Sequence, residues 1–251
     1  MKAESYKIVV LTGLFLSGQF SSAQHPLLFT TEKEATQIKT RLSALPLIQK
    51  SFEDAKQMAD KALSDTMDVP VPKDPAGGYT HDKHKSNYTA MYNAGLIYVI
   101  TREKKYAEFI SSMLLKYAEL NPSLKNHPQS RGSSPGRLFH QALNDANWML
   151  YSAIAYDCRY NTLTNEQRYR IENGAFRSLS NYLTCDLKNW FNLVHNHGIW
   201  ACAAVGITGL AIGDENMVQQ ALLGTDKNGK GGFIAQLNNL FSPDGYYTEG
   251  P

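Results

Sequence analysis

Residues 198–213, with the sequence GIWACAAVGITGLAIG, form a run that has almost no polar face when it is drawn as a helix. The run is too short to cross a bilayer, which takes about 20 apolar residues in helical form. A helix that is apolar all round has to be packed on all sides by other elements. The segment therefore predicts the central helix of a sizeable domain, and its small residues would allow neighbouring helices to approach closely.

Most other segments also carry a helical pattern, and none alternates between apolar and polar residues as a strand does. Thr31 and Glu34 predict a capping box for a helix that ends before Pro46. Two long polar loops, DVPVPKDPAGGYTHDKH and NPSLKNHPQSRGSSPG, interrupt the series of helices. Helices joined alternately by short turns and long loops predict an all-α fold of antiparallel hairpins arranged in a ring or solenoid.

The first 23 residues have the order of a secretory signal peptide. Lys2 and Lys7 precede an apolar run over residues 8–20, and the small residues Ser21, Ser22 and Ala23 follow it. We expect cleavage near Ala23, a mature domain over residues 24–251, and a periplasmic or secreted location. A membrane anchor is the alternative, but the apolar run is too short for a membrane span.

The charge and cysteine content exclude several classes of protein. The net charge is only +2, with 25 Lys and Arg against 23 Asp and Glu scattered along the chain, so no nucleic acid partner is predicted. Cys158, Cys185 and Cys202 allow at most one disulfide, and no CxxC spacing suggests a zinc cluster.

Asn196 and His197 stand immediately before the apolar run, at the predicted start of its helix. The free N–H groups and the dipole at a helix N-terminus favour an anion there. Buried polar groups need partners, so the pair is either part of a binding site or a structural cap. The alternative in which Asn196 merely caps the helix is about equally compatible with the local sequence.

The segment GRLFHQALNDANW, read as a helix, places Arg137, Gln141 and Asn144 near one face and His140 beside them. Polar side chains aligned on an otherwise apolar helix predict the lining of a cleft. Surface solvation and capping explain Arg137 equally well.

The glycine-bearing segment GGYTHDKHKSNY, read as a loop, contributes Tyr79, His81, His84 and Lys85 as predicted substrate contacts. His81 and His84 have a spacing that would suit a metal ion, but no third ligand completes a known set. We therefore predict neither a metal nor another cofactor. Tyr246 and Tyr247 in SPDGYYTEGP are candidate general base and acid groups.

Taken together, the segments PVPKDPAGGYTHDKHKSNY, GRLFHQALNDANW, NHGIWACAAVG and SPDGYYTEGP resemble the alginate lyases of polysaccharide lyase family seventeen, within the heparinase II/III-like group. The resemblance implies an incomplete α/α toroid followed by an antiparallel β-sheet domain that is missing from this sequence. It also implies β-elimination on an acidic polysaccharide. Asn196 and His197 would neutralise the uronate carboxylate, and a tyrosine would remove the C5 proton or protonate the leaving O4.

In such relatives the tyrosine assigned to catalysis follows the EGP element, which here ends the sequence at Pro251. Tyr246 and Tyr247 are therefore stand-in candidates, and the fragment alone is expected to be inactive. For guluronate, an opposite-face base is needed, and His197 is the candidate. The resemblance leaves the choice of uronate and endo or exo action open.

Three other functions remain as alternatives at this point. One is a heparinase-like lyase acting on a glycosaminoglycan, although sulfated substrates call for more clustered Arg and Lys. Another is a glycoside hydrolase, which needs two facing carboxylates chosen from Asp145, Asp157, Asp244 and Glu249. The third is an exported glycan-binding protein, whose binding would not depend on Asn196 or His197.

Overall fold

The computed structural model describes residues 24–248, so the predicted signal peptide, Glu249 and Pro251 lie outside the described residues. Within that range the chain is built from α-helices with short 3₁₀ and π turns, and an isolated antiparallel bridge joins Phe241 and Tyr247. The all-α prediction is confirmed. The helices are α1 (Glu32–Arg41), α2 (Pro46–Ser64), α3 (Tyr79–Thr101), α4 (Lys104–Leu120), α5 (Ala142–Arg159), α6 (Asn165–Ile171), α7 (Ser178–Asn181), α8 (Lys188–Phe191), α9 (Asn196–Ile212), α10 (Glu215–Leu223) and α11 (Gly232–Leu240).

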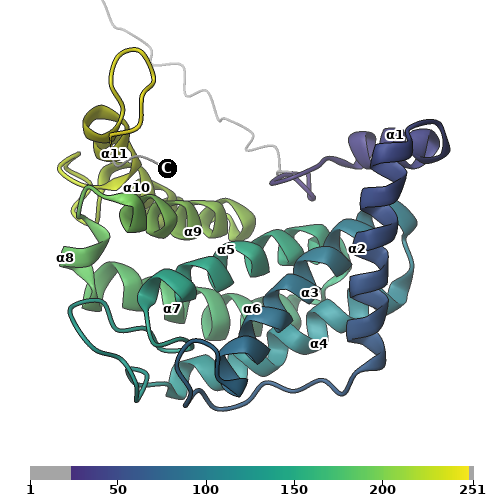
Figure 1. Ribbon diagram of the computed structural model, residues 1–251, viewed down its shortest axis with the longest axis horizontal. Coiled ribbons are helices and arrows are strands. Elements are labelled where there is room, and N and C mark those ends of the chain that lie inside the picture. Colours follow the sequence, from purple (N-terminus) through teal and green to yellow (C-terminus); the bar gives the residue numbers. More distant parts are fainter. Residues whose placement is uncertain (1–23, 249–251) are drawn as a thin grey trace, which may run out of the picture.

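Helices α3, α5 and α9 lie side by side, with α5 in contact with both of the others (Figure 1). Helix α4 packs against α3 and α5, while α10 and α11 pack against α9. Because α4 reverses the chain after α3, α5 runs parallel to α3. The N-terminal ends of α3, α5 and α9 therefore lie toward the same edge of the molecule, at the left of Figure 1.

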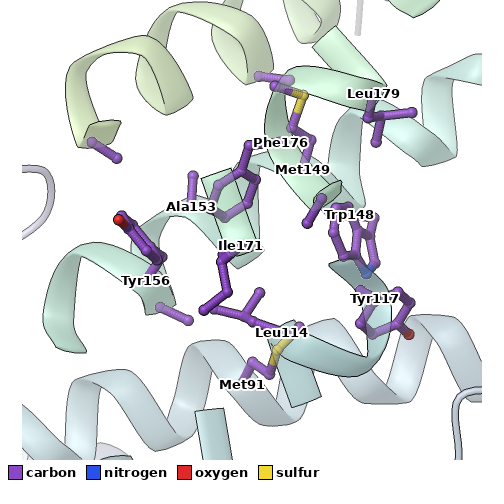
Figure 2. Close-up of a cluster of buried hydrophobic side chains, with 14 of the residues drawn as sticks. Met91, Leu114, Tyr117, Trp148, Met149, Ala153, Tyr156, Ile171, Phe176 and Leu179 are labelled. Atoms are coloured by element: carbon purple, nitrogen blue, oxygen red, sulfur yellow. The ribbon is translucent and has the colours of Figure 1, made fainter. Parts of the chain in front are cut away.

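A cluster of large aromatic and aliphatic side chains fills the space between α3, α4, α5 and the helical segment 165–186 (Figure 2). Trp148 is completely buried, and its ring centroid lies 4.7 Å from that of Tyr117 and 6.4 Å from that of Phe176. Met91, Leu114 and further residues shown in Figure 2 complete the packing. This core fixes α5, and with it the edge at which α5 begins.

Helix α9 is central but is not covered on every side among the described residues. Its buried face includes Ala201, Val205 and Thr208, whereas Trp200 and Leu210 are 39% and 47% exposed. The prediction of a helix packed all round is therefore only partly correct. Small residues do allow the expected close packing, because a Cβ on Gly206 would lie 2.9 Å from the Cβ of Ala221 on α10.

Residues at the start of the described chain form hydrogen bonds with Asp157, near the C-terminal end of α5. His25 Nδ1 lies 2.5 Å from an Asp157 carboxylate oxygen, and the backbone N–H groups of Leu27 and Leu28 donate to the other oxygen at 2.8 and 2.9 Å. The predicted capping box of Thr31 and Glu34 is present at the start of α1. Asp157 is thus a buried structural anchor.

None of the helices between residues 24 and 248 is both long and apolar enough to span a membrane. Cys158, Cys185 and Cys202 are all free thiols, so they form no disulfide.

Candidate functional site

The start of α9 is capped by His195 and not by Asn196. His195 has extended backbone angles, and its Nδ1 accepts a hydrogen bond from the His197 N–H at 3.0 Å. Asn196 is the first residue of the helix and has an exposed side chain, and His197 is the half-buried second residue. The alternative in which Asn196 serves as the cap is therefore wrong, and both residues of the pair stand in the first turn of a long helix.

A glutamine from α11 fixes the turn that leads into α9. The buried Gln236 side chain accepts the His195 N–H at 3.0 Å and donates to the Leu193 carbonyl at 2.7 Å. Gly198 lies directly beneath this amide, where a Cβ would collide with both Gln236 and Leu193. The position of Asn196 and His197 is thus held by residues from two different helices.

A pocket of about 380 Å³ adjoins this turn and is lined by Ser133, Leu193 and residues 185–190. The Trp190 ring belongs to its wall and lies 6.4 Å from the His197 ring, centroid to centroid. We call residues 185–197 the α8–α9 corner. The sequence analysis missed Asp186, Lys188, Asn189 and Trp190. Their signal was present in the polar and aromatic run DLKNW directly before the HNH triplet.

Arg137 and His140 precede α5, which begins at Ala142 after its N-cap Gln141. The prediction that Arg137, Gln141 and Asn144 share one helical face is therefore wrong. The buried Asp145 carboxylate accepts the backbone N–H groups of Arg137 at 2.6 Å and Phe139 at 2.9 Å, which folds residues 136–139 back over the helix start. Burial raises the pKa of Asp145 to about 7, although these N–H groups favour its charged form.

The Arg137 side chain points toward the α8–α9 corner. Its guanidinium lies over the Tyr182 ring, 4.1 Å from the centroid, and one of its nitrogens lies 3.2 Å from the Asp186 carboxylate. Gln141 is exposed and Asn144 is half-buried on the first turn of α5. Of the predicted cleft residues, Arg137 is thus linked to the corner through Asp186.

Helix α3 begins at Tyr79, within the segment predicted as a loop, so Tyr79, His81, His84 and Lys85 belong to a helix. Gly78 is its N-cap, and Asp74 and Thr80 exchange hydrogen bonds that close the preceding turn. Tyr79 is exposed and donates to Asp68 at 2.7 Å. Lys85 faces α2, away from the histidines of the same turn.

His81 and His84 are buried near two histidines from the loop before α5, the buried His127 and the half-buried His140. We call His81, His84, His127 and His140 the histidine cluster. The ring centroids of His81 and His140 are 5.6 Å apart, and both His81 and His84 contact the Phe139 ring. Burial lowers the pKa of His81, of His127 and of His84, the last to about 4. Within residues 24–248 no group of His, Cys, Asp or Glu has the arrangement of a metal site.

Burial favours the neutral form of the His84 imidazole. The Tyr117 hydroxyl accepts from Asn87 at 3.0 Å and lies 2.9 Å from His84 Nδ1. The Pro70 carbonyl and Asp68 favour protonation of the ring. Burial and the neighbouring His127 and His81 oppose it.

We expect the free energy of unfolding to decrease by up to about 3 kcal/mol as the pH falls from about 6.5 to about 4, because of His84 alone. Below pH 6.5 the unfolded chain takes up a proton at this residue, while the folded ring stays neutral until about pH 4. Urea unfolding at pH 7 and pH 5 measures the loss. The difference should shrink in His84→Asn, and an unchanged difference would contradict the assignment.

Tyr246 and Tyr247 lie in a turn that follows α11. The Ser242 N–H donates to the Tyr246 carbonyl at 2.9 Å, and the Phe241 and Tyr247 rings lie 5.2 Å apart. Tyr246 is exposed and Tyr247 is half-buried.

The carboxylates proposed for hydrolysis do not form a facing pair among the described residues. Asp145 and Asp157 lie on the first and last turns of α5, about 18 Å apart at the rise of an α-helix. Each is buried and holds backbone N–H groups. Asp244 is exposed in the turn after α11, and Glu249 lies outside the described residues.

Comparison with known proteins identifies the family of the chain. Residues 30–249 match the alginate lyase family, and the chain belongs to that family. It is 43% identical over 242 residues to the exo-oligoalginate lyase of Saccharophagus degradans, covering 96% of this chain and 33% of the relative. It is 44% identical over 191 residues to an alginate lyase of Stenotrophomonas maltophilia, covering 76% of this chain and 26% of the relative. The chain thus spans a third or less of the length of these relatives.

Proposed function

We propose that this chain is the helical part of a polysaccharide lyase that cleaves alginate by β-elimination. The observation that carries the proposal is the position of Asn196 and His197 on the first turn of α9, fixed by the His195 cap and by Gln236. This end of a helix is where a substrate carboxylate is stabilised by N–H groups and by the helix dipole. Membership of the alginate lyase family supplies the substrate class.

The proposed reaction begins when the uronate carboxylate binds at Asn196 and His197. Donors at this position become more effective as an enolate forms and negative charge grows on the carboxylate, which makes the C5 proton easier to remove. Tyr246 or Tyr247 takes the C5 proton and protonates O4 as the C4–O4 bond breaks. For guluronate, His197 takes the C5 proton on the opposite face, and the tyrosine protonates O4 as the C4–O4 bond breaks. The product carries a C4–C5 double bond.

The finer assignment is part of the same proposal. We propose that the chain belongs to polysaccharide lyase family seventeen of the heparinase II/III-like group and that its helices form part of an α/α toroid. The adjacent helices α3, α5 and α9 support that architecture, with α2 and α4 packed against α3 and α10 packed against α9. Export to the periplasm or medium after cleavage near Ala23 is also proposed. N-terminal sequencing of the exported protein should begin near Gln24, and a retained Met1 would refute export.

We expect the full-length enzyme to produce ultraviolet absorbance from polymannuronate or polyguluronate and little or none from heparan sulfate. The C4–C5 double bond conjugated to the carboxylate absorbs in the ultraviolet, whereas a hydrolysis product does not. A continuous absorbance assay, run beside a reducing-end assay, distinguishes the reactions. A stronger response to heparan sulfate would move the assignment to a glycosaminoglycan lyase. Binding of polyuronate without either signal would indicate a glycan-binding protein.

A further inference from the structure

We infer that Arg137 is a second carboxylate-binding position beside the α8–α9 corner, and that Asp186 occupies it as an internal competitor until substrate arrives. This inference rests on the proposed function, and it names residues that control the affinity for the neighbouring uronate. Alginate carries a carboxylate on every sugar ring. A polymer held by one carboxylate at Asn196 and His197 therefore brings further carboxylates to the adjoining pocket.

The pocket is lined by a neighbour of each position. Asp186, the ion-pair partner of Arg137, belongs to its lining together with Trp190, whose ring lies against His197. Lys188 and Asn189 add a cation and an amide to the same wall. A uronate that enters beside Trp190 thus meets hydrogen-bond donors and the carboxylate that currently holds Arg137.

The guanidinium of Arg137 is held in place before any ligand binds. Its backbone N–H is fixed by Asp145, and the turn is closed by a bond from the His127 N–H to the Gly136 carbonyl at 2.7 Å. The Tyr182 ring supports the guanidinium from one side, and the Tyr182 hydroxyl is itself tied to the Pro135 carbonyl at 2.7 Å. A cation fixed in this way loses little conformational entropy when a carboxylate binds.

The contact with Asp186 is weak compared with what a guanidinium can make. A single nitrogen approaches one carboxylate oxygen at 3.2 Å, and the Asp186 side chain is 58% exposed. An arginine fork can bind a carboxylate through two parallel hydrogen bonds, and the buried Arg137 Nε has no hydrogen-bond partner among residues 24–248. Exposed ion pairs of this kind contribute only about 0.2–1 kcal/mol. Replacing Asp186 by a substrate carboxylate therefore requires little free energy to break the existing ion pair.

The inference predicts that Asp186→Asn binds polyuronate more tightly than the unmodified full-length enzyme. Releasing an exposed ion pair should lower KM by about two- to fivefold. Arg137→Gln should raise KM by about tenfold, since a hydrogen bond to a charged group is lost. A residue with only a structural role would not give a gain when it is changed.

An exposed ion pair on α2 supplies the matched control. Lys50 and Asp54 are 3.1 Å apart, the Asp54 side chain is about as exposed as that of Asp186, and neither residue lines the pocket. Asp54→Asn removes the same single negative charge from another part of the surface. If the gain in Asp186→Asn were general attraction of a polyanion, Asp54→Asn would lower KM equally, and that result would overturn the inference.

Calorimetric binding of a mannuronate tetrasaccharide, in an Asn196→Ala background where turnover is slow, separates this inference from the proposed function. Asp186→Asn should tighten binding there and Arg137→Gln should weaken it, while Asp54→Asn leaves it unchanged. Binding of a neutral mannose tetrasaccharide should respond to none of these changes. Thermal melting by circular dichroism checks that each variant is folded. Binding that responds as predicted without elimination would contradict the proposed function alone. Elimination by the unmodified enzyme with equal affinities in all variants would overturn the inference alone.

Discussion

Replacing Asn196 or His197 by alanine is expected to reduce the turnover of the full-length enzyme on polymannuronate by about a hundredfold or more, the usual loss for one donor that stabilises a growing anion. KM should change far less. The reason is that the contact with the carboxylate strengthens as the enolate forms, so its removal affects the transition state more than the bound substrate. Initial rates of absorbance over a range of substrate concentrations separate the two parameters.

Asn216→Ala is the matched control for this prediction. Asn216 is exposed on the first turn of α10, as Asn196 is on the first turn of α9, and it lies outside the α8–α9 corner. Its replacement should leave both kinetic parameters within about twofold, a change worth less than half a kcal/mol. Full activity in both Asn196→Ala and His197→Ala would mean that the pair has only a structural role.

Trp148→Ala is expected to cost about 3–5 kcal/mol of the free energy of unfolding, the range for removing a fully buried tryptophan. The indole fills the space between Tyr117 and Phe176, and its loss leaves a cavity within the cluster shown in Figure 2. Because Tyr117 also holds His84, the histidine cluster should loosen at the same time.

Urea unfolding followed by circular dichroism measures this loss at pH 7. Trp200→Ala provides the comparison, because Trp200 is 39% exposed on α9 and leaves a smaller cavity when it is truncated. The cost at Trp148 should be clearly the larger of the two. Similar costs at both positions would contradict the placement of Trp148 at the centre of the core.

Local signals in the sequence were sufficient for the helical fold. The capping box of Thr31 and Glu34 and the apolar run of α9 were both identified from residues close together in the chain. The start of α3 was misjudged, because Gly77 and Gly78 and the nearby prolines suggested a continuing loop. Reciprocal hydrogen bonds between Asp74 and Thr80 end that loop at Gly78. The glycine and proline content alone does not indicate this pairing.

The candidate site was predictable where one helix end defines it and not where distant segments meet. Asn196 and His197 were found from the contrast between a polar pair and an apolar helix. The alternative that Asn196 caps the helix was wrong, because His195 takes that role and its backbone N–H is held by Gln236, 41 residues further on. The environment of Arg137 depends on Asp145, Tyr182 and Asp186, and the histidine cluster unites α3 with His127 and His140. Such contacts follow from tertiary packing and not from local spacing.

The most direct test of the lyase assignment is the mass of the new non-reducing ends formed when the full-length enzyme cleaves polymannuronate in water enriched in oxygen-18. β-Elimination should give ends that are lighter by one water molecule than saturated ends, with no oxygen-18 incorporated at the cleaved bond. Saturated products that carry oxygen-18 would show hydrolysis and would contradict the account.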